Sequence, residues 1–448
     1  MNPISKAEFK RELTPILLWG LGVGYVISGM YFGWNLGLKE GGTGGMAMAT
    51  FFSIILYTFF SLSYAELACY IPKAGGVFDY SYQAWGKDLG FIAGLAQIIE
   101  FVFAPPAIAF GIGAYFNLFF PSVSLLSIAI GVYLFFTALN IYGVKAAASF
   151  ELLVTVIAVF EILIFTGVTL PHFKMEHLQQ NAFPNGWSGV FASIPFAIWF
   201  FLGIEGLANV AEETKNPQRD ISRGFGSSIT TLVILCVLVF ISSVGVGGWE
   251  KIVFKNGVGG ETSDSPLPLA MAAVVGDNSF LFHMLLSVGI FGLIASFHGL
   301  ILASGRSSFE FGKAGFAPSY LGMIHPRFKT PALALFTNMI IGIIALLTNK
   351  TGEIITLSVL GAVTLYIISL ISLFRLRKID PGTPRPFKVP FYPWMPGIAL
   401  IIAGVALFAI VFFNPRLAVI YFSILIIGFI IFRLFNSNTK SYETRRDS

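Results

Sequence analysis

Residues 20–31 read GLGVGYVISGMY and place four glycines within ten positions of an otherwise apolar stretch. Each glycine inside a helix costs about 1 kcal/mol relative to alanine, so a membrane helix formed here is expected to be interrupted. Residues 199–206 read WFFLGIEG and place two glycines and a carboxylate in a second apolar stretch. Both interruptions predict a buried polar site, because irregular backbone at membrane depth must face protein or a water-filled cavity.

The composition places the chain in a lipid bilayer. Hydrophobic residues make up 56% of the 448 positions and charged residues only 11%, which is too apolar for the surface of a soluble globule. Apolar stretches long enough to cross a hydrocarbon core of about 30 Å recur along the sequence. They predict an all-α polytopic membrane protein with twelve transmembrane helices, at about residues 14–38, 46–70, 88–118, 122–142, 147–170, 188–212, 226–248, 280–304, 331–348, 354–375, 396–414 and 416–436.

The spacing of the two interrupted stretches predicts the internal organisation. They lie five spans apart, which is typical of a 5+5 inverted repeat whose broken helices line a central site. We expect a single transmembrane domain over residues 1–436, with repeats at about 14–170 and 188–375. Two extra helices at about 396–436 would serve packing or homodimerisation, and residues 437–448 would form a cytoplasmic tail. Alternatively, the glycines of the first stretch only let neighbouring helices approach closely.

The distribution of positive charge predicts the orientation. All but six of the 28 Lys and Arg residues fall on the side that holds both termini, the exceptions being Lys39, Lys174, Lys251, Lys255, Lys350 and Arg416. Short loops rich in positive charge stay cytoplasmic, so both termini of this multi-pass protein should be cytoplasmic, in the inner or plasma membrane of the cell. The net charge of +5 reflects this topology and predicts no nucleic-acid partner.

The sequence predicts no enzyme. Cys69 and Cys236 both lie inside predicted spans, so neither a disulfide framework nor a four-ligand metal site is expected. An enzyme would need a nucleophile with its base, a metal cluster or a cofactor motif, and the sequence shows none of these arrangements. We therefore expect no cofactor and no bound metal, and membrane lipid as the surrounding solvent.

Three acids fall well inside predicted spans: Glu100, Glu161 and Glu205. No basic residue lies in the core of any span to neutralise them. Acids inside a membrane are costly and usually functional, so each is expected either to carry a proton or to meet a cation. The alternative for Glu100 is a neutral carboxyl that only forms a hydrogen bond with a neighbouring helix.

Four motifs give the chain a resemblance to the amino acid, polyamine and organocation permease superfamily. They are the Ser28-Gly29 interruption; YAEL at 64–67 with PKAGG at 72–76, Gly86 and Gly90; EETKNPQR at 212–219 after the second interruption; and the loop from Arg306 through GFAP at 315–318 to KTP at 329–331. This superfamily shares the inverted-repeat fold of the bacterial leucine transporter. Residues 22–38 and FEL at 150–152 look most like bacterial ethanolamine permeases.

The resemblance implies roles at the first interruption. Ser28 and Gly29 align with the positions where backbone amides of related carriers meet a substrate carboxylate. Ile27 stands where many amino acid carriers have a further glycine, so its side chain should crowd a carboxylate. That substitution favours a substrate without one.

The resemblance also implies roles in later spans. Trp199, Phe201 and Gly203 match positions whose carbonyls take the substrate ammonium and whose aromatic side chains form a lid. Glu100 matches a substrate-facing position, which makes it a partner for an amine or hydroxyl. Glu205, within the second interruption, is a further candidate substrate-binding residue. For Trp199 and Phe201, the alternative is ordinary packing, which is the usual role of aromatic residues in so aromatic a chain.

The coupling ion is the remaining question. Proton-coupled relatives often carry a lysine in span 5, and counting from Lys145 its position is Ala158 here. Glu161, one helical turn further, replaces it as the titrating group in our interpretation. A sodium site built from span 1 carbonyls and Ser296 is the alternative. His298, within a turn of Ser296, either faces the same cavity or forms a hydrogen bond with a neighbouring helix.

These observations predict a secondary active transporter that imports a small amine such as ethanolamine, coupled to protons, by alternating access. An amino acid permease or exchanger for zwitterionic amino acids is the alternative reading. A nutrient sensor with the same fold would keep the binding site and lose only turnover, and a flux measurement would separate it from a carrier.

Overall fold

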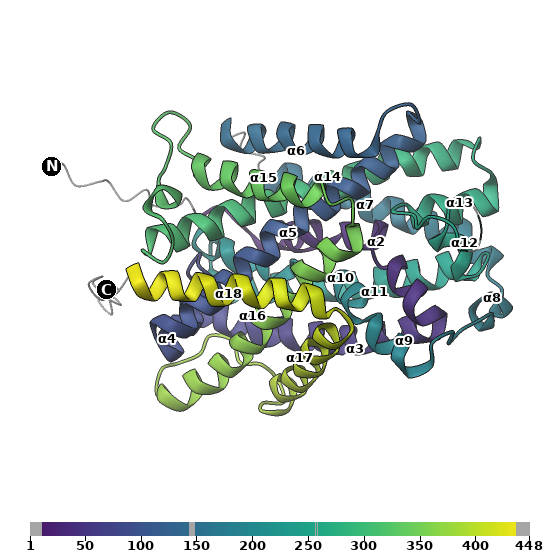
Figure 1. Cartoon of the computed structure of the whole chain (residues 1–448). Coiled ribbons are helices and arrows are strands. Elements are labelled where there is room, and N and C mark those ends of the chain that lie inside the picture. The colour runs from purple at the N-terminus through teal and green to yellow at the C-terminus, as the bar shows by residue number, and fades with distance from the viewer. Residues whose placement is uncertain (1–10, 143–147, 256, 258, 436–448) are drawn as a thin grey trace.

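The computed structural model describes residues 11–142, 148–255, 257 and 259–435. These residues form an almost entirely helical bundle (Figure 1). In chain order its elements are α1 Pro15–Val26, α2 Ser28–Tyr31, α3 Asn35–Tyr70, α4 Val77–Trp85, α5 Lys87–Phe119, α6 Leu125–Tyr142, α7 Ala148–Thr169, η1 Leu170–His172, α8 Met175–Gln179, α9 Gly186–Ala192, α10 Ile194–Trp199, η2 Ile204–Glu213, α11 Pro217–Gly245, α12 Trp249–Val253, α13 Pro266–Val275, α14 Phe280–Lys313, η3 Ser319–Gly322, α15 Ala332–Leu346, α16 Thr351–Ile379, α17 Trp394–Phe413 and α18 Pro415–Phe435.

Ten of these helical segments are long and apolar enough to cross a membrane, counted within the described ranges. Three shorter apolar helices, α1, α13 and α15, accompany them. The twelve predicted spans all find a counterpart: the first is divided among α1, α2 and the start of α3, the sixth among α9, α10 and η2, and the ninth is α15. The predicted tail at 437–448 and Lys145 lie outside the described residues.

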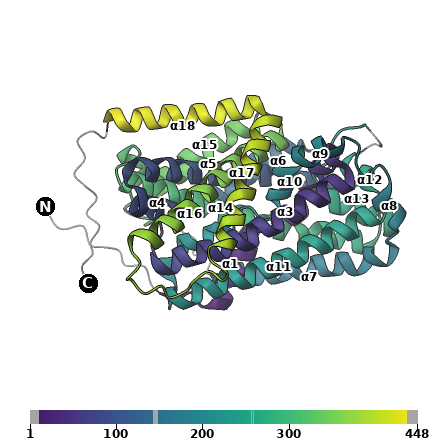
Figure 2. The same ribbon diagram turned by 90° about the horizontal axis from the view of Figure 1, so that it is seen from below.

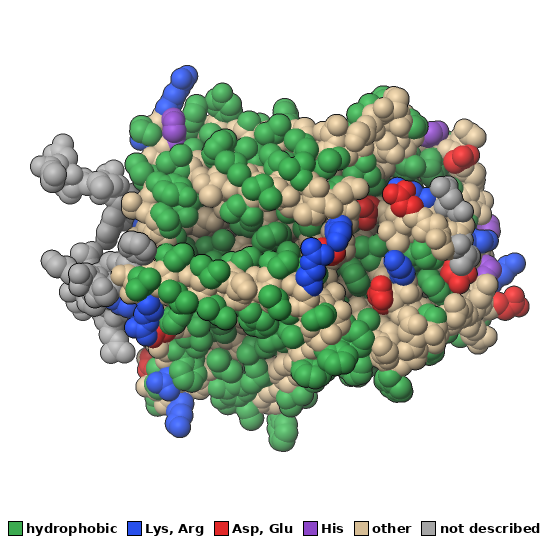
Figure 3. Space-filling view, viewed as in Figure 1, with side chains coloured by type: hydrophobic (Ala, Val, Ile, Leu, Met, Phe, Trp, Pro, Cys, Tyr) green, Lys and Arg blue, Asp and Glu red, His purple; other side chains and the backbone are tan. Residues whose placement is uncertain are grey.

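The long helices run roughly along one direction, with the short helices α8, α12 and α13 gathered at one end of the bundle (Figure 1). After a quarter turn, α18 is seen along the edge of the molecule (Figure 2). Its side chains and those of α17 are largely exposed and apolar, whereas α5 and α16 are mostly buried. Hydrophobic side chains predominate over the left and central parts of the face in Figure 3. This surface fits a lipid solvent, as the composition predicts.

The first broken helix departs from regularity in two places. At Ile27 the backbone keeps helical dihedral angles but forms a tighter turn. The Met30 amide donates to the Ile27 carbonyl, three residues earlier, at 3.0 Å. The open backbone follows at Phe32 and Gly33, where Phe32 is extended and Gly33 has φ of +87°. The interruption predicted at Ser28-Gly29 is present, because α1 ends at Val26 and the Ser28 amide donates to the Ser296 hydroxyl in place of the Gly24 carbonyl. The open turn at Phe32 and Gly33 is a second departure, which the sequence did not predict.

The second broken helix lies where the sequence predicts it. Helix α10 ends at Trp199, and Gly203 adopts φ of +103° before the chain resumes as the 3₁₀ helix η2. This left-handed conformation favours glycine because it has no Cβ. A Cβ at Gly203 would also lie 3.4 Å from the Tyr25 carbonyl oxygen of α1. The two broken helices therefore pack directly against each other.

Candidate functional site

The two interruptions meet at the centre of the bundle. The Trp199 indole nitrogen donates to the Phe32 carbonyl at 3.1 Å. A Cβ at Gly29 would lie 2.5 Å from the Trp199 carbonyl oxygen, closer than real Cβ contacts allow. Glycine at position 29 therefore permits the close approach of the two backbones, and Trp199 crosses from one break to the other.

Two acids lie beside this junction with their side chains fully buried. Glu205 of η2 is held by two donors: the Gly203 amide reaches Oε1 at 3.1 Å and the Tyr366 hydroxyl reaches Oε2 at 3.0 Å. The Tyr366 hydroxyl also lies 2.8 Å from the hydroxyl of Tyr57. Helices α3 and α16 thus supply a chain of hydroxyl groups that ends on the Glu205 carboxyl.

Glu100 of α5 faces the Glu205 carboxyl, and apart from that carboxyl neither of its oxygens has a hydrogen-bond partner among the described residues. No described lysine, arginine or histidine forms an ion pair with either acid. The backbone at this point is tied to α16, because Ser358 donates to the Glu100 carbonyl at 2.8 Å. Two buried acids therefore face each other without a compensating cation.

Aromatic rings pack beside the two broken helices. The Phe201 ring lies 5.2 Å from the ring of Tyr57, and the Trp199 ring lies 5.5 Å from that of Phe32, as measured between centroids. Trp199 is 3% exposed and Phe201 is fully buried. These rings therefore belong to the packed interior of the bundle, and Tyr57 connects them to the acid pair through the Tyr366 hydroxyl.

Ser296 of α14 is bound to the first broken helix. Its hydroxyl donates to the Gly24 carbonyl at 2.6 Å and accepts the Ser28 amide at 2.9 Å. Ile27 beside it is fully buried. The His298 ring packs 6.3 Å from Phe136 of α6, and its Nε2 has no partner among described residues. Ser296 therefore lies at the broken helix, whereas His298 points toward α6.

Glu161 of α7 is buried and accepts a hydrogen bond from the Tyr31 hydroxyl. That hydroxyl also lies 3.2 Å from the Ala158 carbonyl, and the Tyr115 hydroxyl donates to the Tyr31 carbonyl at 3.3 Å. Tyr31 is the last residue of α2. A change at the Glu161 carboxyl therefore acts directly on the outer part of the first broken helix, although Glu161 itself lies outside the acid pair.

The end of the bundle that carries the start of α1 is closed. Arg306 forms an ion pair with Glu213 at 2.7 Å, and the Glu213 carbonyl accepts the Leu13 amide at 3.0 Å. Further in, the Gln97 amide reaches Asn209 at 3.2 Å. These contacts join α1, η2, α5 and α14 and cover the acid pair from this side.

A cavity of about 520 Å³ lies at the opposite end of the bundle. Lysines and acids line it together with Phe110 and Phe196. Asp264 at its wall accepts a hydrogen bond from Thr351 at 2.9 Å, and burial raises the pKa of Asp264 to about 6. The neighbouring Ser263 carbonyl accepts the Asn35 amide at 2.7 Å. The loop that covers this end is thus tied to both α3 and α16.

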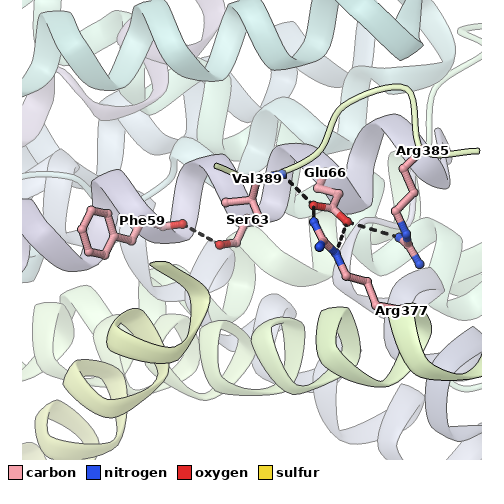
Figure 4. Close-up of polar contacts among 6 residues, drawn as sticks. All are labelled: Phe59, Ser63, Glu66, Arg377, Arg385 and Val389. Carbon is pink, nitrogen blue, oxygen red and sulfur yellow. Dashed lines mark hydrogen bonds and ion pairs between the residues drawn. The ribbon is translucent and has the colours of Figure 1, made fainter. Parts of the chain in front are cut away.

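Another buried acid, Glu66 of α3, has different surroundings (Figure 4). Arg377 donates from Nε to Glu66 Oε1 at 2.8 Å, the Val389 amide donates to Oε2 at 2.7 Å, and Arg385 lies 3.5 Å from Oε1. The Arg377 guanidinium also lies over the Tyr392 ring at 3.8 Å. Glu66 is therefore fully compensated by two cations and a backbone amide.

Sequence reasoning found the acids but missed their hydroxyl partners. Tyr57, Tyr366 and Tyr31 lie in apolar rows of a chain in which aromatic residues make up 15% of positions, so nothing in the sequence distinguishes them. Within the described ranges, no group of three or more His, Cys, Asp or Glu residues is placed to hold a metal ion. The site is built from two acids, tyrosine hydroxyls and aromatic rings.

Two broken helices that meet around buried acids, within a bundle of membrane-crossing helices, define a multi-pass membrane transport protein. The chain belongs to the amino acid permease family, whose model matches residues 18–434. The superfamily predicted from the sequence motifs is thereby confirmed.

Individual relatives agree with this assignment. The chain is 27% identical over 454 residues to the branched-chain amino acid permease of Bacillus subtilis, covering 96% of this chain and 94% of that protein. It is 26% identical over 405 residues to the low-affinity putrescine importer of Escherichia coli K12, covering 87% of each.

A solved structure confirms the fold. A mutant of the Eremococcus coleocola manganese transporter superposes with a TM-score of 0.58, covering 97% of this chain and 99% of that one. At 14% sequence identity, this likeness concerns the fold alone. The fold is the leucine-transporter type predicted above, with a 5+5 inverted repeat and two C-terminal helices.

Proposed function

We propose that this chain is a secondary active transporter that imports a small amine such as ethanolamine by alternating access. The observation that carries the proposal is the Glu100 and Glu205 pair, which is buried without a described cation. An uncompensated buried charge is costly, so the pair requires a bound proton or a bound cation. A small ammonium group would supply that charge and would be released when the site opens to water.

The aromatic residues near the acid pair support the same class of substrate. Tyr366 donates to Glu205, its hydroxyl lies 2.8 Å from that of Tyr57, and the Tyr57 ring packs against Phe201. A desolvated ammonium over such a ring gains about 1–2 kcal/mol of cation–π attraction. The Glu100 carboxyl, which has no other described partner, is then the acceptor for the amine or for a substrate hydroxyl.

The surroundings of Ser28 support a substrate without a carboxylate. The Ser28 amide already donates to the Ser296 hydroxyl, and Gly29 is closed in by the Trp199 carbonyl. Ile27 fills the space beside them. The likeness of residues 22–38 and 150–152 to ethanolamine permeases favours ethanolamine within this class.

A zwitterionic amino acid is the second candidate, and the likeness to a branched-chain amino acid permease favours it. In that case the Ser28 amide would exchange its Ser296 partner for a substrate carboxylate. A non-transporting sensor would bind either ligand and show no flux.

We propose proton coupling through Glu161, because its contact with Tyr31 connects a titratable group to the first broken helix. Sodium coupling would require Ser296 to turn its hydroxyl from the Gly24 carbonyl toward an ion. In the proposed orientation both termini are cytoplasmic in the inner or plasma membrane, so the cavity of about 520 Å³ opens to the outside.

The test is uptake of labelled ethanolamine into proteoliposomes, with an inward proton gradient, an inward sodium gradient or neither. Neutral, acidic and basic amino acids and putrescine are added as competitors. We expect proton-driven ethanolamine uptake that amino acids fail to block. Uptake blocked by an amino acid would favour the second candidate, and saturable binding without flux would favour a sensor.

A further inference from the structure

A further buried acid, Glu151, has no place in the site described above. It lies in the first turn of α7 and is 4% exposed. Its Oε1 has no hydrogen-bond partner, and Glu151 forms no ion pair, within the residues that the structure describes. In the sequence, residues 150–152 were noted only as part of a family resemblance. That resemblance gives no reason for a carboxyl group to be buried at position 151.

Two glycines admit this carboxyl between α1, α7 and α14. A Cβ at Gly24 of α1 would lie 2.7 Å from Glu151 Oε1, and a Cβ at Gly299 of α14 would lie 3.8 Å from it. Any larger residue at position 24 would collide with the carboxyl. The three helices therefore bury Glu151 Oε1 at a point where no described cation contacts it.

The same place is where α1 is held to its neighbours. Thr155, one turn after Glu151, donates to the Gly20 carbonyl at 3.0 Å. Ser296 of α14 donates to the Gly24 carbonyl at 2.6 Å. The carboxyl thus lies between the two hydrogen bonds that fix α1 against α7 and α14, and any movement of α1 that opens this end of the bundle must uncover it.

Among the described residues, the titratable groups on the packed helices form no ion pair with Glu151. On α1, the Tyr25 hydroxyl interacts with it. On α14, Arg306 is paired with Glu213 and His298 packs against α6. Helix α13 carries no titratable side chain. The remaining groups are on α11 and η1, where Arg223 is exposed and the others, Arg219, Asp220, Cys236 and His172, have no described interaction with Glu151.

We propose that Glu151 is a proton-binding residue of the transport cycle, which holds a proton while α1 is closed against α7 and α14 and releases it to water when α1 moves away. An ionised carboxyl buried here would have no cation among the described residues, whereas a neutral one fits without that cost. Before α1 can close again against α7 and α14, the Glu151 carboxyl must take a proton from the solution to which it is exposed. The proton returns to the side from which it came, so this step regulates the rate of cycling and is separate from coupling at Glu161.

This inference rests on the proposed transport function and on the orientation with α1 starting at the cytoplasmic side. It predicts that transport depends on the internal pH. Once internal pH is high enough for reclosure to limit the cycle, the rate should fall by about tenfold per pH unit, as expected for one required proton. With Gln at position 151 the reclosure step needs no proton, and the internal pH dependence should disappear.

The experiment measures exchange of labelled ethanolamine in proteoliposomes at constant external pH and internal pH from about 5.5 to 8.5, and compares wild type with Glu151→Gln. Glu12→Gln, an exposed acid at the same end, is the matched control and should keep the wild-type profile. A Glu151→Gln profile as steep as that of wild type would overturn the proposal. Absence of any flux in wild type would instead count against the proposed function.

A second readout does not depend on transport. Carbodiimides react with protonated carboxyl groups in apolar surroundings, and the modified peptide is identified by mass spectrometry. We expect Glu151 in wild-type protein to be modified near neutral pH, together with loss of flux. If Glu151 stays unmodified across the whole pH range in transport-competent protein, it does not hold the proton.

Discussion

Glu66 and the Glu100–Glu205 pair are buried to the same degree, yet their surroundings differ in kind. Glu66 accepts hydrogen bonds from Arg377 and the Val389 amide and has Arg385 at 3.5 Å. The pair has tyrosine hydroxyls and a backbone amide but no described cation. A buried acid whose charge is fully matched holds the fold together, whereas an unmatched one leaves its charge for a ligand.

The largest effect on stability should come from removing the charge of Glu66, whose carboxylate is paired with two arginines. Glu66→Gln leaves Arg377 and Arg385 buried beside a neutral amide, and loss of one partner from a buried ion pair costs about 3–5 kcal/mol. We expect a large fall in thermal stability and in the yield of monodisperse protein, measured by heating followed by size-exclusion chromatography. Glu353→Gln at the partly exposed Lys350 pair is the control and should behave as wild type. A Glu66→Gln protein as stable as wild type would remove the structural role.

Glu161→Gln should remove proton coupling and leave substrate binding at the Glu100–Glu205 pair unchanged. Removing the titratable group that contacts Tyr31 should abolish accumulation driven by a pH gradient and leave ethanolamine exchange largely intact. Uptake driven by a gradient and exchange without one are compared in the same proteoliposomes. Unchanged accumulation in the variant would exclude Glu161 as the coupling group.

Tyr366→Phe tests whether the tyrosine hydroxyl that donates to Glu205 contributes to substrate binding. The variant removes the 3.0 Å donor to Glu205 and keeps the ring. A hydrogen bond to a charged group contributes about 1.5–3 kcal/mol, so ethanolamine affinity should change by roughly tenfold or more if Glu205 is ionised when substrate binds. The change is measured by equilibrium binding. Thr364→Val, two positions away on the same helix, is the control, and equal affinity in Tyr366→Phe would show that the hydroxyl does not act on the bound state.

The smallest effect is expected at Asp264, outside the spans. Burial raises its pKa from 3.8 to about 6, so the folded state favours the protonated form. Its contribution to stability is therefore fully present below about pH 4 and is lost as the pH rises through 6. Asp264→Asn should reduce the drop in melting temperature between pH 5 and pH 7.5 by a few degrees. An identical drop in both proteins would contradict the assigned pKa.

Much of the fold follows from local sequence, as the two broken helices illustrate. Gly203 lies between an aromatic run and Glu205, and its φ of +103° matches the break expected there. The interruption predicted at Ser28-Gly29 is present, but the open turn that follows at Phe32 and Gly33 was not predicted. Local composition marks where a helix weakens, but it does not show the tertiary contacts, such as the Ser296 bond to Ser28, that satisfy the interrupted backbone.

The candidate site was partly predictable for a similar reason. Acids within apolar spans are rare enough to stand out, so Glu100, Glu161 and Glu205 were found from sequence alone. Their hydroxyl partners were not, and neither was the pairing of Glu66 with Arg377, which lies 311 positions away. A single sequence shows that a charge is buried but not what the fold brings to meet it.

The measurement that tests the central claim most directly is equilibrium binding of labelled ethanolamine to purified wild-type protein, Glu100→Gln and Glu205→Gln, with thermal stability recorded for each. We predict that both variants lose affinity by at least tenfold while their stability stays close to that of wild type, because no described cation is left unpaired by either change. Wild-type affinity in both variants would show that the acid pair does not bind the amine, and the account of this site would fail.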